Sequence, residues 1–160
     1  MELRNGYYQL PAGKMANAVT WMELTELERD PPPTPPGLTL RRLGPADAAL
    51  HRRLYRAVGE PWLWSGLIDK DEADLAAHLG ASGVLSCALE VDGEPAGLLD
   101  LESTEGEGIE IVYFGLVQGH CGKGVGAWMM SQAIRIAREA GHKRLWLHTC
   151  NFDHPASVAF

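Results

Sequence analysis

The sequence predicts an α+β domain of three layers, in which a mixed, mostly antiparallel central sheet is flanked by helices. Segments that alternate like strands outnumber segments with helical periodicity, and the expected order along the chain is β-α-α-β-β-β-α-β-α. Two consecutive strands meet at Asp92-Gly93, a dipeptide typical of a tight antiparallel hairpin. A third strand leads into a glycine cluster, a helix and a further strand, which form one βαβ unit.

The composition fits one soluble domain and excludes several classes of partner. The chain has 160 residues, of which 46% are hydrophobic, so it can bury a substantial core. Its apolar runs are too short to span a bilayer, and its N-terminus lacks the pattern of a secretory signal, so we expect no membrane partner. The net charge is −7 and the basic runs are short, which argues against nucleic acid as a partner. Three widely spaced cysteines (Cys87, Cys121 and Cys150) indicate a reducing compartment, so we expect a cytoplasmic protein.

A proline-rich stretch divides the chain. Residues 30–37, DPPPTPPG, contain five prolines, which fix φ and remove hydrogen-bond donors, and they predict an extended linker. The linker separates an N-terminal extension, residues 1–29, from a main domain, residues 38–160. Within the extension, Val-Thr-Trp favours a strand and MELTELE favours a helix. We expect a strand pair in this extension that docks on the main domain.

The main domain is expected to begin with a strand and two helices. The segment LTLRRL, residues 38–43, alternates as a strand does. Residues 44–59 predict a helix with Pro45 in its first turn. Residues 68–80 predict a second helix, with Asp69 as its N-cap.

The hairpin and the βαβ unit follow. Apolar segments bounded by turn residues predict the remaining strands at residues 84–91, 96–103, 108–117 and 143–149. Between the last two strands, residues 125–141 predict a helix that ends at a glycine. Residues 154–160 predict the start of one more helix, with Pro155 in its first turn.

The stretch QGHCGKGVGAWMM, residues 118–130, carries the main functional signal, because a glycine cluster that opens a helix usually holds a phosphate group. A P-loop is rejected, since Gly122-Lys123 is followed by Gly124 rather than by Ser or Thr. A nicotinamide-dinucleotide site fits the spacing of Gly122, Gly124 and Ala127, but it needs an acidic residue about 20 residues later, and none is there. Coenzyme A is the third interpretation, because its pyrophosphate also needs N–H groups at a helix N-terminus.

These residues carry a resemblance to a known family. The segment CGKGVGAWMMSQAI resembles the Q/R-x-x-G-x-G/A motif of the GNAT superfamily of acyl-CoA N-acyltransferases, with Cys121 at the Gln/Arg position and Gly124 and Gly126 at the two glycines. The resemblance covers residues 38–160 and implies a GNAT-like sheet, splayed at the coenzyme A site, with acetyl-CoA as the cofactor. The residues that it assigns to cofactor binding are Leu116, Val117, Cys121, Gly122, Lys123, Gly124, Val125, Gly126, Ala127, Asn151 and His154.

The resemblance implies an N-acetyltransferase that moves an acetyl group from acetyl-CoA to a primary amine by direct attack in a ternary complex. A protonated amine cannot attack a thioester, so a base must remove its proton, and Glu110 is our candidate, with a role as a solvent-facing strand residue as its alternative. In the family a backbone N–H at the splay stabilises the thioester oxygen, which here implies Leu116 or Val117. The family's usual acid is a tyrosine. Tyr113 is a candidate substitute, with a role in the core or the wall of the site as its alternative.

Two tryptophans are candidates for acceptor binding. Trp62 and Trp64 lie between the first two helices, and in members of the family this connection commonly covers the acceptor site. Aromatic faces suit a cationic or flat amine, and simple core packing is the equally weighted alternative. The expected acceptor is a small-molecule amine or a peptide amine. The segment HTCNFDH lacks the paired spacing of a zinc site, so no metal is expected.

The sequence departs from the family pattern at its end. The family's tyrosine and its last two strands would follow Phe160, so we expect a sheet that is incomplete, or that a partner or a swapped segment completes. An exposed sheet edge favours association, which makes a homodimer one expected form. The missing elements also keep a second function open, namely a coenzyme A-binding GNAT-like module without turnover.

Overall fold

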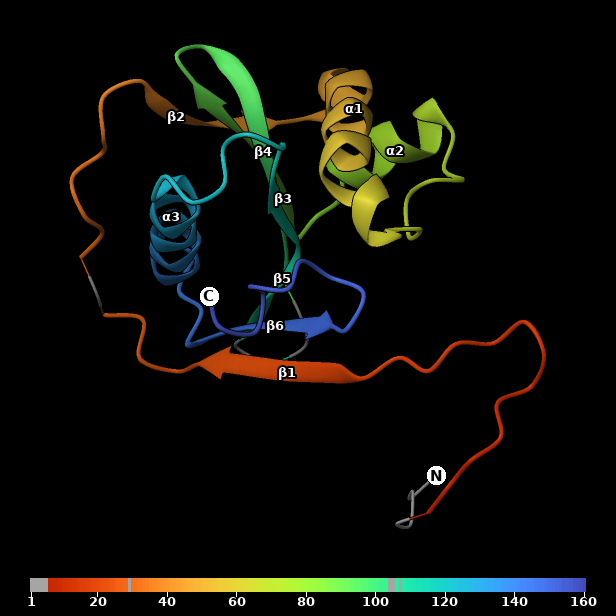
Figure 1. Cartoon of the computed structure of the whole chain (residues 1–160). Coiled ribbons are helices and arrows are strands. Elements are labelled where there is room, and N and C mark those ends of the chain that lie inside the picture. The colour runs from red at the N-terminus through yellow and green to blue at the C-terminus, as the bar shows by residue number, and fades with distance from the viewer. Residues whose placement is uncertain (1–5, 29, 104–105, 107) are drawn as a thin grey trace.

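The computed structural model describes residues 6–28, 30–103, 106 and 108–160. This part of the chain forms a six-stranded sheet in the order β1-β6-β5-β4-β3-β2 (Figure 1). β5 and β6 run parallel, and the other neighbouring strands run antiparallel. The strands are β1 (Val19–Leu24), β2 (Leu38–Leu43), β3 (Val84–Val91), β4 (Glu94–Ser103), β5 (Gly108–Leu116) and β6 (Arg144–Cys150). The predicted fold class, a mixed and mostly antiparallel sheet flanked by helices, is confirmed.

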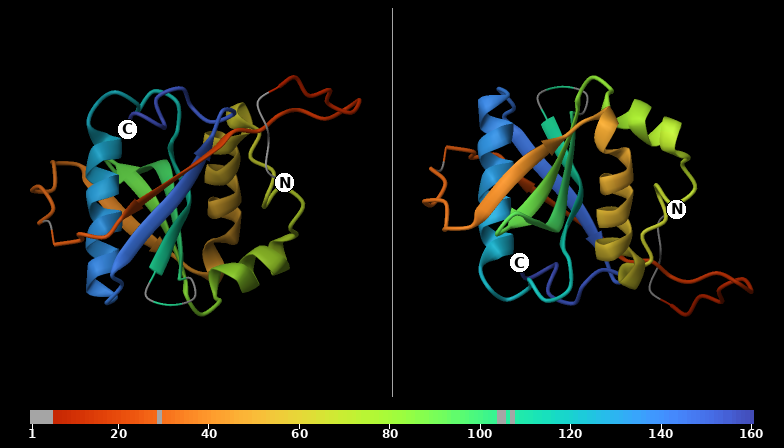
Figure 2. Two further views of the ribbon diagram at one scale, coloured as in Figure 1. Left: turned by 90° about the horizontal axis from the view of Figure 1, so that it is seen from below. Right: turned by 90° about the horizontal axis from the view of Figure 1, so that it is seen from above.

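Helices cover both faces of the sheet. α1 (Ala48–Gly59) and α2 (Glu72–Leu79) lie on one face, and α3 (Val125–Glu139) lies on the other (Figures 1 and 2). Two short 3-10 helices, η1 (Pro45–Asp47) and η2 (Glu60–Trp62), flank α1. Leu54 and Val58 are buried in α1, as are Met129 and Ala133 in α3, and a spacing of four keeps each pair on the sheet side of its helix. Among the described residues, no helix is both long and apolar enough to cross a membrane.

The β3–β4 hairpin confirms the predicted turn. Asp92 and Gly93 both have positive φ, 53° and 85°, as a two-residue type I′ turn requires. The strands that it joins supply the centre of the core, where Leu89, Leu98 and Leu99 are fully buried. Leu98 packs towards α1 and α2, whereas Leu89 and Leu99 pack towards α3, so the hairpin is covered on both faces.

α2 begins three residues after the predicted cap. The N-cap is Asp71, whose side-chain oxygen accepts a hydrogen bond of 2.8 Å from the N–H of Asp74. The assignment of Asp69 to this role is wrong, because Ser65 to Lys70 form successive turns in which the N–H of Lys70 donates to the carbonyl of Leu67. Both aspartates suit a cap by residue type, and the turn geometry selects the later one.

β5 and β6 diverge in the middle of the sheet. Their parallel pairing runs from Gly108 and Arg144 to Ile111 and Leu147, whereas β5 continues to Leu116 and β6 to Cys150. A register shift between β4 and β5 leaves Val112 outside the pairing, which is a β-bulge. Bulges bend the strand that carries them, and the two strands separate directly after this one. The sheet therefore has the predicted splay.

The N-terminal region contributes one strand to the main sheet. β1 pairs antiparallel with β6 along its whole length, from Val19 opposite Cys150 to Leu24 opposite Leu145. The sequence predicts a strand pair here, but residues 6–18 form no strand, because they run out from the body and have no strand beside them (Figure 1). Leu27, after β1, is 5% exposed and belongs to the core under α3. The N-terminal region is thus packed into the domain as far as Leu27.

The predicted final helix is replaced by turns. Residues 151–160 form turns and a bend, with hydrogen bonds from Ser157 to His154 and from Phe160 to Ala156 along the backbone. A single helical turn gains few internal hydrogen bonds for the residues that it orders, so this short segment takes its shape from its neighbours. The ring of Phe160 lies 5.6 Å from that of Phe114, centroid to centroid, and next to Gly126.

Because Leu27 is buried, its truncation should destabilise the whole domain. We expect Leu27→Ala to lower the free energy of unfolding by about 2–5 kcal/mol, the usual cost of a cavity in a core. The matched control is Leu10→Ala, since Leu10 is 51% exposed and its truncation should change stability by less than about 0.5 kcal/mol. Urea denaturation followed by circular dichroism measures both. Equal, small effects would show that the N-terminal region does not pack on the core.

Candidate coenzyme A and acceptor site

The splay leaves one edge of β5 free of β6. The N–H of Val117 donates a 2.8 Å hydrogen bond to the carbonyl of Ala96 on β4. In an antiparallel ladder this bond makes Leu116 and Gly97 a non-hydrogen-bonded pair, so the backbone groups of Leu116 point away from β4. By the same alternation those of Phe114 do too. Of the two predicted oxyanion donors, Leu116 therefore directs its N–H into the splay, and Val117 uses its own N–H within the sheet.

The glycine cluster forms an open loop between β5 and α3. Gly119, Gly122 and Gly124 have positive φ, and a Cβ added to any of them would meet nothing within 4 Å. Gly124 is the N-cap of α3, whose first turn leaves backbone N–H groups without helical partners. Cys121 and Lys123 are exposed on this loop. Positive φ favours glycine, and the loop presents its backbone without a Cβ in the way, which is the geometry that an anionic oxygen needs.

Glu110 lies on the part of β5 that pairs with β6, opposite Trp146 and just before the splay. Its carboxylate is 3.1 Å from Nδ1 of His148, and only 17% of its side chain is exposed. Burial raises the pKa of Glu110, while the hydrogen bond from His148 acts in the opposite direction. Glu102 stands directly opposite Glu110 on β4, and its charge raises the pKa of Glu110 a little further. A half-buried carboxylate with a raised pKa is better suited to accept a proton than an ordinary surface glutamate.

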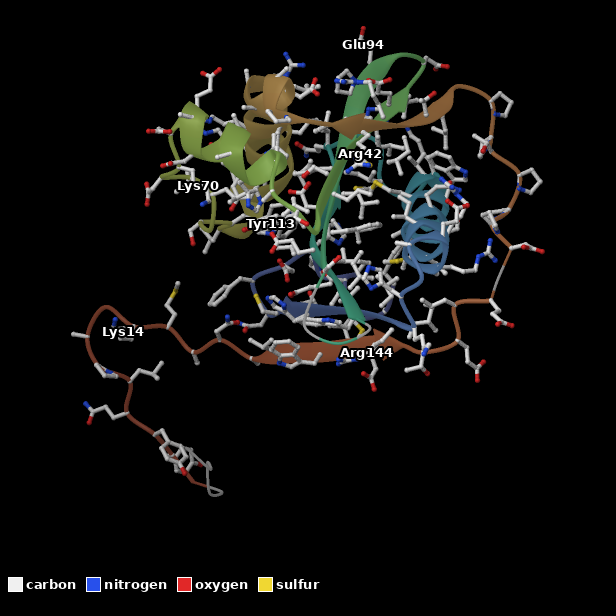
Figure 3. All side chains as sticks on the ribbon, turned by 180° about the vertical axis from the view of Figure 1, so that it is seen from behind. Lys14, Arg42, Lys70, Glu94, Tyr113 and Arg144 are labelled. Carbon is white, nitrogen blue, oxygen red and sulfur yellow. The ribbon has the colours of Figure 1, made fainter. Side chains whose placement is uncertain are left out.

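Tyr113 lies on the face covered by α1 and α2 (Figure 3). It packs edge-on against Tyr55, with ring centroids 5.0 Å apart, and opposite Asp100 in the strand register. Burial raises the pKa of Tyr113, and the nearby Tyr55 raises it further. A higher pKa makes the hydroxyl a weaker proton donor, so these contacts favour a role in the wall of the site.

Beneath Tyr113 lies a buried pair that the sequence did not reveal. Nε2 of His51 is 2.7 Å from a carboxylate oxygen of Asp100, and both residues are almost fully buried. The ring of His51 is roughly parallel to that of Tyr55 at 6.4 Å between centroids. The pair anchors α1 to β4 and so fixes the wall to which Tyr113 belongs.

The two candidate acceptor tryptophans occupy different environments. Trp64 packs against Tyr55 and Tyr113 and donates from its indole N–H to Asp153 at 3.3 Å. Trp62 meets His154 in a T-shaped contact with ring centroids 5.1 Å apart. Trp64 is thus part of the core under α1, whereas Trp62 faces the segment that follows β6.

Asn151 and His154 are engaged within the chain. The side-chain oxygen of Asn151 accepts a 2.6 Å hydrogen bond from the N–H of Ala18, which ties the start of β1 to the end of β6. Nδ1 of His154 accepts a 3.1 Å hydrogen bond from the N–H of Ala156. Through these hydrogen bonds, the two predicted cofactor-binding residues stabilise the segment that follows β6, beside the splay. Residues 116 and 121–127 lie at the end of β5 where the splay opens.

Two features elsewhere in the described chain bear on the choice of site. Its histidines, cysteines and acidic residues include no group of three placed to hold a metal ion. A hollow of about 410 Å³ lies between β2–β3 and the C-terminal half of α3. Its lining begins at Arg135, roughly 15 Å along the helix from the glycine loop at 1.5 Å per residue, and includes none of the predicted site residues.

Sequence reasoning missed two residues at this site. In the sequence, His148 belongs to the segment HTCNFDH, which lacks the spacing of a zinc site and gives no other functional signal. Its contact with Glu110 depends on the parallel register of β5 and β6. Trp21 stacks on both Trp146 and His148, with ring centroids 5.2 Å and 5.1 Å away. Its place follows from the pairing of β1 with β6, which joins residues more than 120 positions apart and leaves no local signal.

A mixed sheet, splayed beside a glycine loop that opens a helix, is the arrangement that the resemblance to acyl-CoA N-acyltransferases predicts. A model of the acetyltransferase (GNAT) family matches residues 48–160, which is more than half of the chain. The chain belongs to the GNAT acetyltransferase family, a family of acyltransferase enzymes.

Individual relatives are more distant. The streptothricin acetyltransferase of Streptomyces lavendulae is 35% identical over 74 residues, which are 46% of this chain and only 39% of that protein. An aminoglycoside acetyltransferase from an uncultured soil metagenomic sample has a similar structure, with a TM-score of 0.63, 20% identity and coverage of 77% of this chain and 88% of that one. The PaiA N-acetyltransferase of Thermoplasma acidophilum, solved in complex with coenzyme A, has a TM-score of 0.54 and 16% identity, over 66% of this chain and 74% of that one. At these identities the structures support the shared fold.

The three cysteines should differ in reactivity. Cys121 is exposed on the glycine loop, whereas Cys87 is buried and its burial raises the pKa of the thiol to about 12. Since the thiolate is the reactive form, we expect iodoacetamide at pH 8 to modify Cys121 first and Cys87 last. Peptide mass spectrometry over a time course measures the order. Faster modification of Cys87 than of Cys121 in the folded protein would contradict the placement of the loop.

Proposed function

We propose that the protein is an N-acetyltransferase that transfers an acetyl group from acetyl-CoA to a primary amine by direct attack in a ternary complex. The observation that carries this proposal is the splay itself. It leaves a backbone edge of β5 free beside an open glycine loop, and the half-buried carboxylate of Glu110 lies earlier on the same strand. Membership of the GNAT family supports the reaction class.

The chain's own residues fit the proposed cofactor. The N–H groups of residues 121–127, around the positive-φ glycines Gly122 and Gly124, would receive the pyrophosphate, where the partial charge of the α3 N-terminus favours an anion. The ammonium group of Lys123 is exposed on the same loop. The free backbone groups of Phe114 and Leu116 would pair with an extended arm, as one strand pairs with another. Acetyl-CoA supplies the activated acetyl group as a thioester.

Glu110 would remove the proton that blocks attack. An ammonium group has no lone pair, so the acceptor reacts only after a base takes a proton from it. The raised pKa of Glu110 makes this transfer less unfavourable than to an ordinary carboxylate, and His148 holds the carboxylate in position. The base must be reached from the sheet face opposite α3, because Ile109 and Ile111 beside it pack under α3.

The remaining charges would be met by the backbone and by solvent. The N–H of Leu116 points into the splay, where it can stabilise the thioester oxygen as that atom gains negative charge. As nitrogen bonds to the acyl carbon and the carbon–sulfur bond breaks, sulfur leaves as a thiolate, and the second proton that the nitrogen loses passes through solvent to this thiolate. A thiol with an ordinary pKa of about 8.5 leaves readily, so the weak acidity of Tyr113 does not block the reaction.

The acceptor is proposed to be an amine-bearing small molecule. A streptothricin acetyltransferase and an aminoglycoside acetyltransferase are among the similar proteins, and both names describe enzymes that act on small molecules. The net charge of −7 favours a cationic substrate.

The role of the glycine loop in cofactor binding can be tested by adding a side chain at Gly124. In the wild-type protein we expect acetyl-CoA at about 100 times its Kd to raise Tm by about 5–10 °C. Gly124→Glu should abolish this shift, because it places bulk and negative charge where the pyrophosphate would bind. Gly93→Glu is the matched control, since Gly93 also has positive φ with open space around it but lies in the β3–β4 turn. Gly93→Glu should introduce a similar backbone strain but keep the shift in Tm with acetyl-CoA. An unchanged Tm of the wild-type protein with acetyl-CoA would refute the cofactor assignment.

The role of Glu110 as the base can be tested by the pH dependence of the activity. Glu110→Gln should lower kcat by about 10²- to 10⁴-fold, the usual contribution of a positioned base. In the wild-type protein kcat/KM should rise with pH through a midpoint above the ordinary carboxylate range, because Glu110 must be ionised to act and burial raises its pKa. Glu102→Gln removes a neighbouring like charge, so it should keep activity and move this midpoint to lower pH. The measurement is thiol release with dithionitrobenzoate at saturating acetyl-CoA.

Two other outcomes would change the assignment. If Glu110→Gln is as active as the wild type at every pH, Glu110 is not the base. If acetyl-CoA binds but no thiol is released with any amine of a broad panel, the chain is a coenzyme A-binding module without turnover.

A further inference from the structure

Part of the sheet face that carries Glu110 is not covered by helices. α1 and α2 pack on Leu43, Ala88 and Leu98, which belong to β2, β3 and β4. β6 and β1 lie at the other end of the sheet, away from these helices (Figures 1 and 2). An acceptor that reaches Glu110 therefore approaches over the part of the face formed by β6 and β1.

This part of the face carries a group of stacked aromatic rings. Trp21 of β1 stands opposite His148 of β6 in the strand register, and their ring centroids are 5.1 Å apart. Trp21 also stacks on Trp146, at 5.2 Å and an interplanar angle of 25°. Trp21 is 65% exposed, so its ring is presented to solvent. We call Trp21, Trp146 and His148 the aromatic platform.

The platform is continuous with the proposed base. His148 contacts Trp21 on one side and holds the carboxylate of Glu110 at 3.1 Å on the other. One imidazole ring thus separates the indole of Trp21 from Glu110. A substrate whose amine lies at Glu110 can place a second group, several bonds away, on the indole of Trp21.

The surroundings of the platform favour a cation. The guanidinium of Arg144 already lies 5.8 Å from the ring centroid of Trp146, which is a cation–π contact within the chain (Figure 3 marks Arg144 at this end of the sheet). The charge of Arg144 is offset by Glu23, whose carboxylate is 2.6 Å away. Glu102 and Glu110 add two carboxylates on neighbouring strands. A second cation would therefore meet an aromatic face and a local excess of carboxylates.

We propose that the N-terminal strand completes the acceptor site, and that Trp21 binds a second cationic group of the substrate, so that the preferred acceptor is a diamine or polyamine rather than a monoamine. The proposal rests on the proposed acetyl transfer for its choice of reacting amine. The reacting nitrogen gives its proton to Glu110, and the second nitrogen stays protonated over the indole ring.

The test compares two acceptors of equal length. 1,5-Diaminopentane and n-pentylamine carry the same reacting group and differ in the second ammonium. We expect the wild-type protein to prefer the diamine in kcat/KM, and Trp21→Ala to lower kcat/KM for the diamine about tenfold, mainly through KM, while n-pentylamine changes less than about twofold. Trp21→Phe should retain most of the preference, because it keeps an aromatic face. Val19→Ala, two residues away on the same strand, should leave the preference unchanged.

The opposite results are equally clear. An equal loss for both amines would show that Trp21 supports the fold of the site rather than the second cation, and no loss would show that it does not contact the substrate. If the wild-type protein acetylates no amine, the proposed function fails. The proposed role of the aromatic platform is then tested by the binding of 1,5-diaminopentane without any reaction. In that case the indole N–H resonance of Trp21, assigned with Trp21→Phe, should shift and saturate when 1,5-diaminopentane is titrated, and not with n-pentylamine. An unmoved resonance would overturn the proposal.

Discussion

The arrangement of the site depends on the separation of β5 from β6 after Ile111 and Leu147. Up to that point the strands pair and bury Ile109 and Ile111 beneath α3. Beyond it, the β-bulge at Val112 bends β5. The backbone groups of Leu116 still point away from β4, but β6 no longer pairs with them. The glycine loop opens where the two strands have separated, whereas Glu110 contacts His148 from the paired part of β5, opposite Trp146. The free donor of Leu116 and the opening for the glycine loop therefore follow from one irregularity in β5, and the candidate base lies in the paired segment before it.

A second constraint is the edge of β6. A strand with an unpaired edge exposes a row of backbone donors and acceptors, which proteins generally cover. Here the chain's own N-terminal region covers it through β1, held by strand pairing, by the contact of Asn151 with Ala18 and by the burial of Leu27. The cover also brings Trp21 onto the face that carries the proposed base. A segment that looks from the sequence like an appendage before a proline-rich linker is thus part of the sheet, and in our proposal part of the acceptor site.

The sequence predicts local features well and non-local ones poorly. The hairpin at Asp92-Gly93, the start of α3 at the glycine cluster and the mixed sheet follow from residue types whose conformational preferences act within a few positions. The choice of Asp71 over Asp69 depends on the preceding turns, and the turns after Cys150 depend on packing against Gly126 and Phe114, so neither could be read from propensity. The site divides in the same way. The glycine loop and Glu110 are predicted site residues because of their motif and position. The hydrogen bond that occupies the Val117 N–H, the His51–Asp100 pair and the aromatic platform appear only once the strand register is known.

The central claim is that the mouth of the splay holds coenzyme A through backbone N–H groups, and amide hydrogen exchange tests it most directly. With saturating coenzyme A, peptides that span residues 114–127 should exchange more slowly, because their amides become hydrogen-bond donors to the ligand and α3 is held at its N-terminus. Peptides from the β3–β4 turn and from residues 6–18 should exchange at unchanged rates. Protection confined to another part of the sheet, or no protection at residues 114–127 when coenzyme A is bound, would contradict the account.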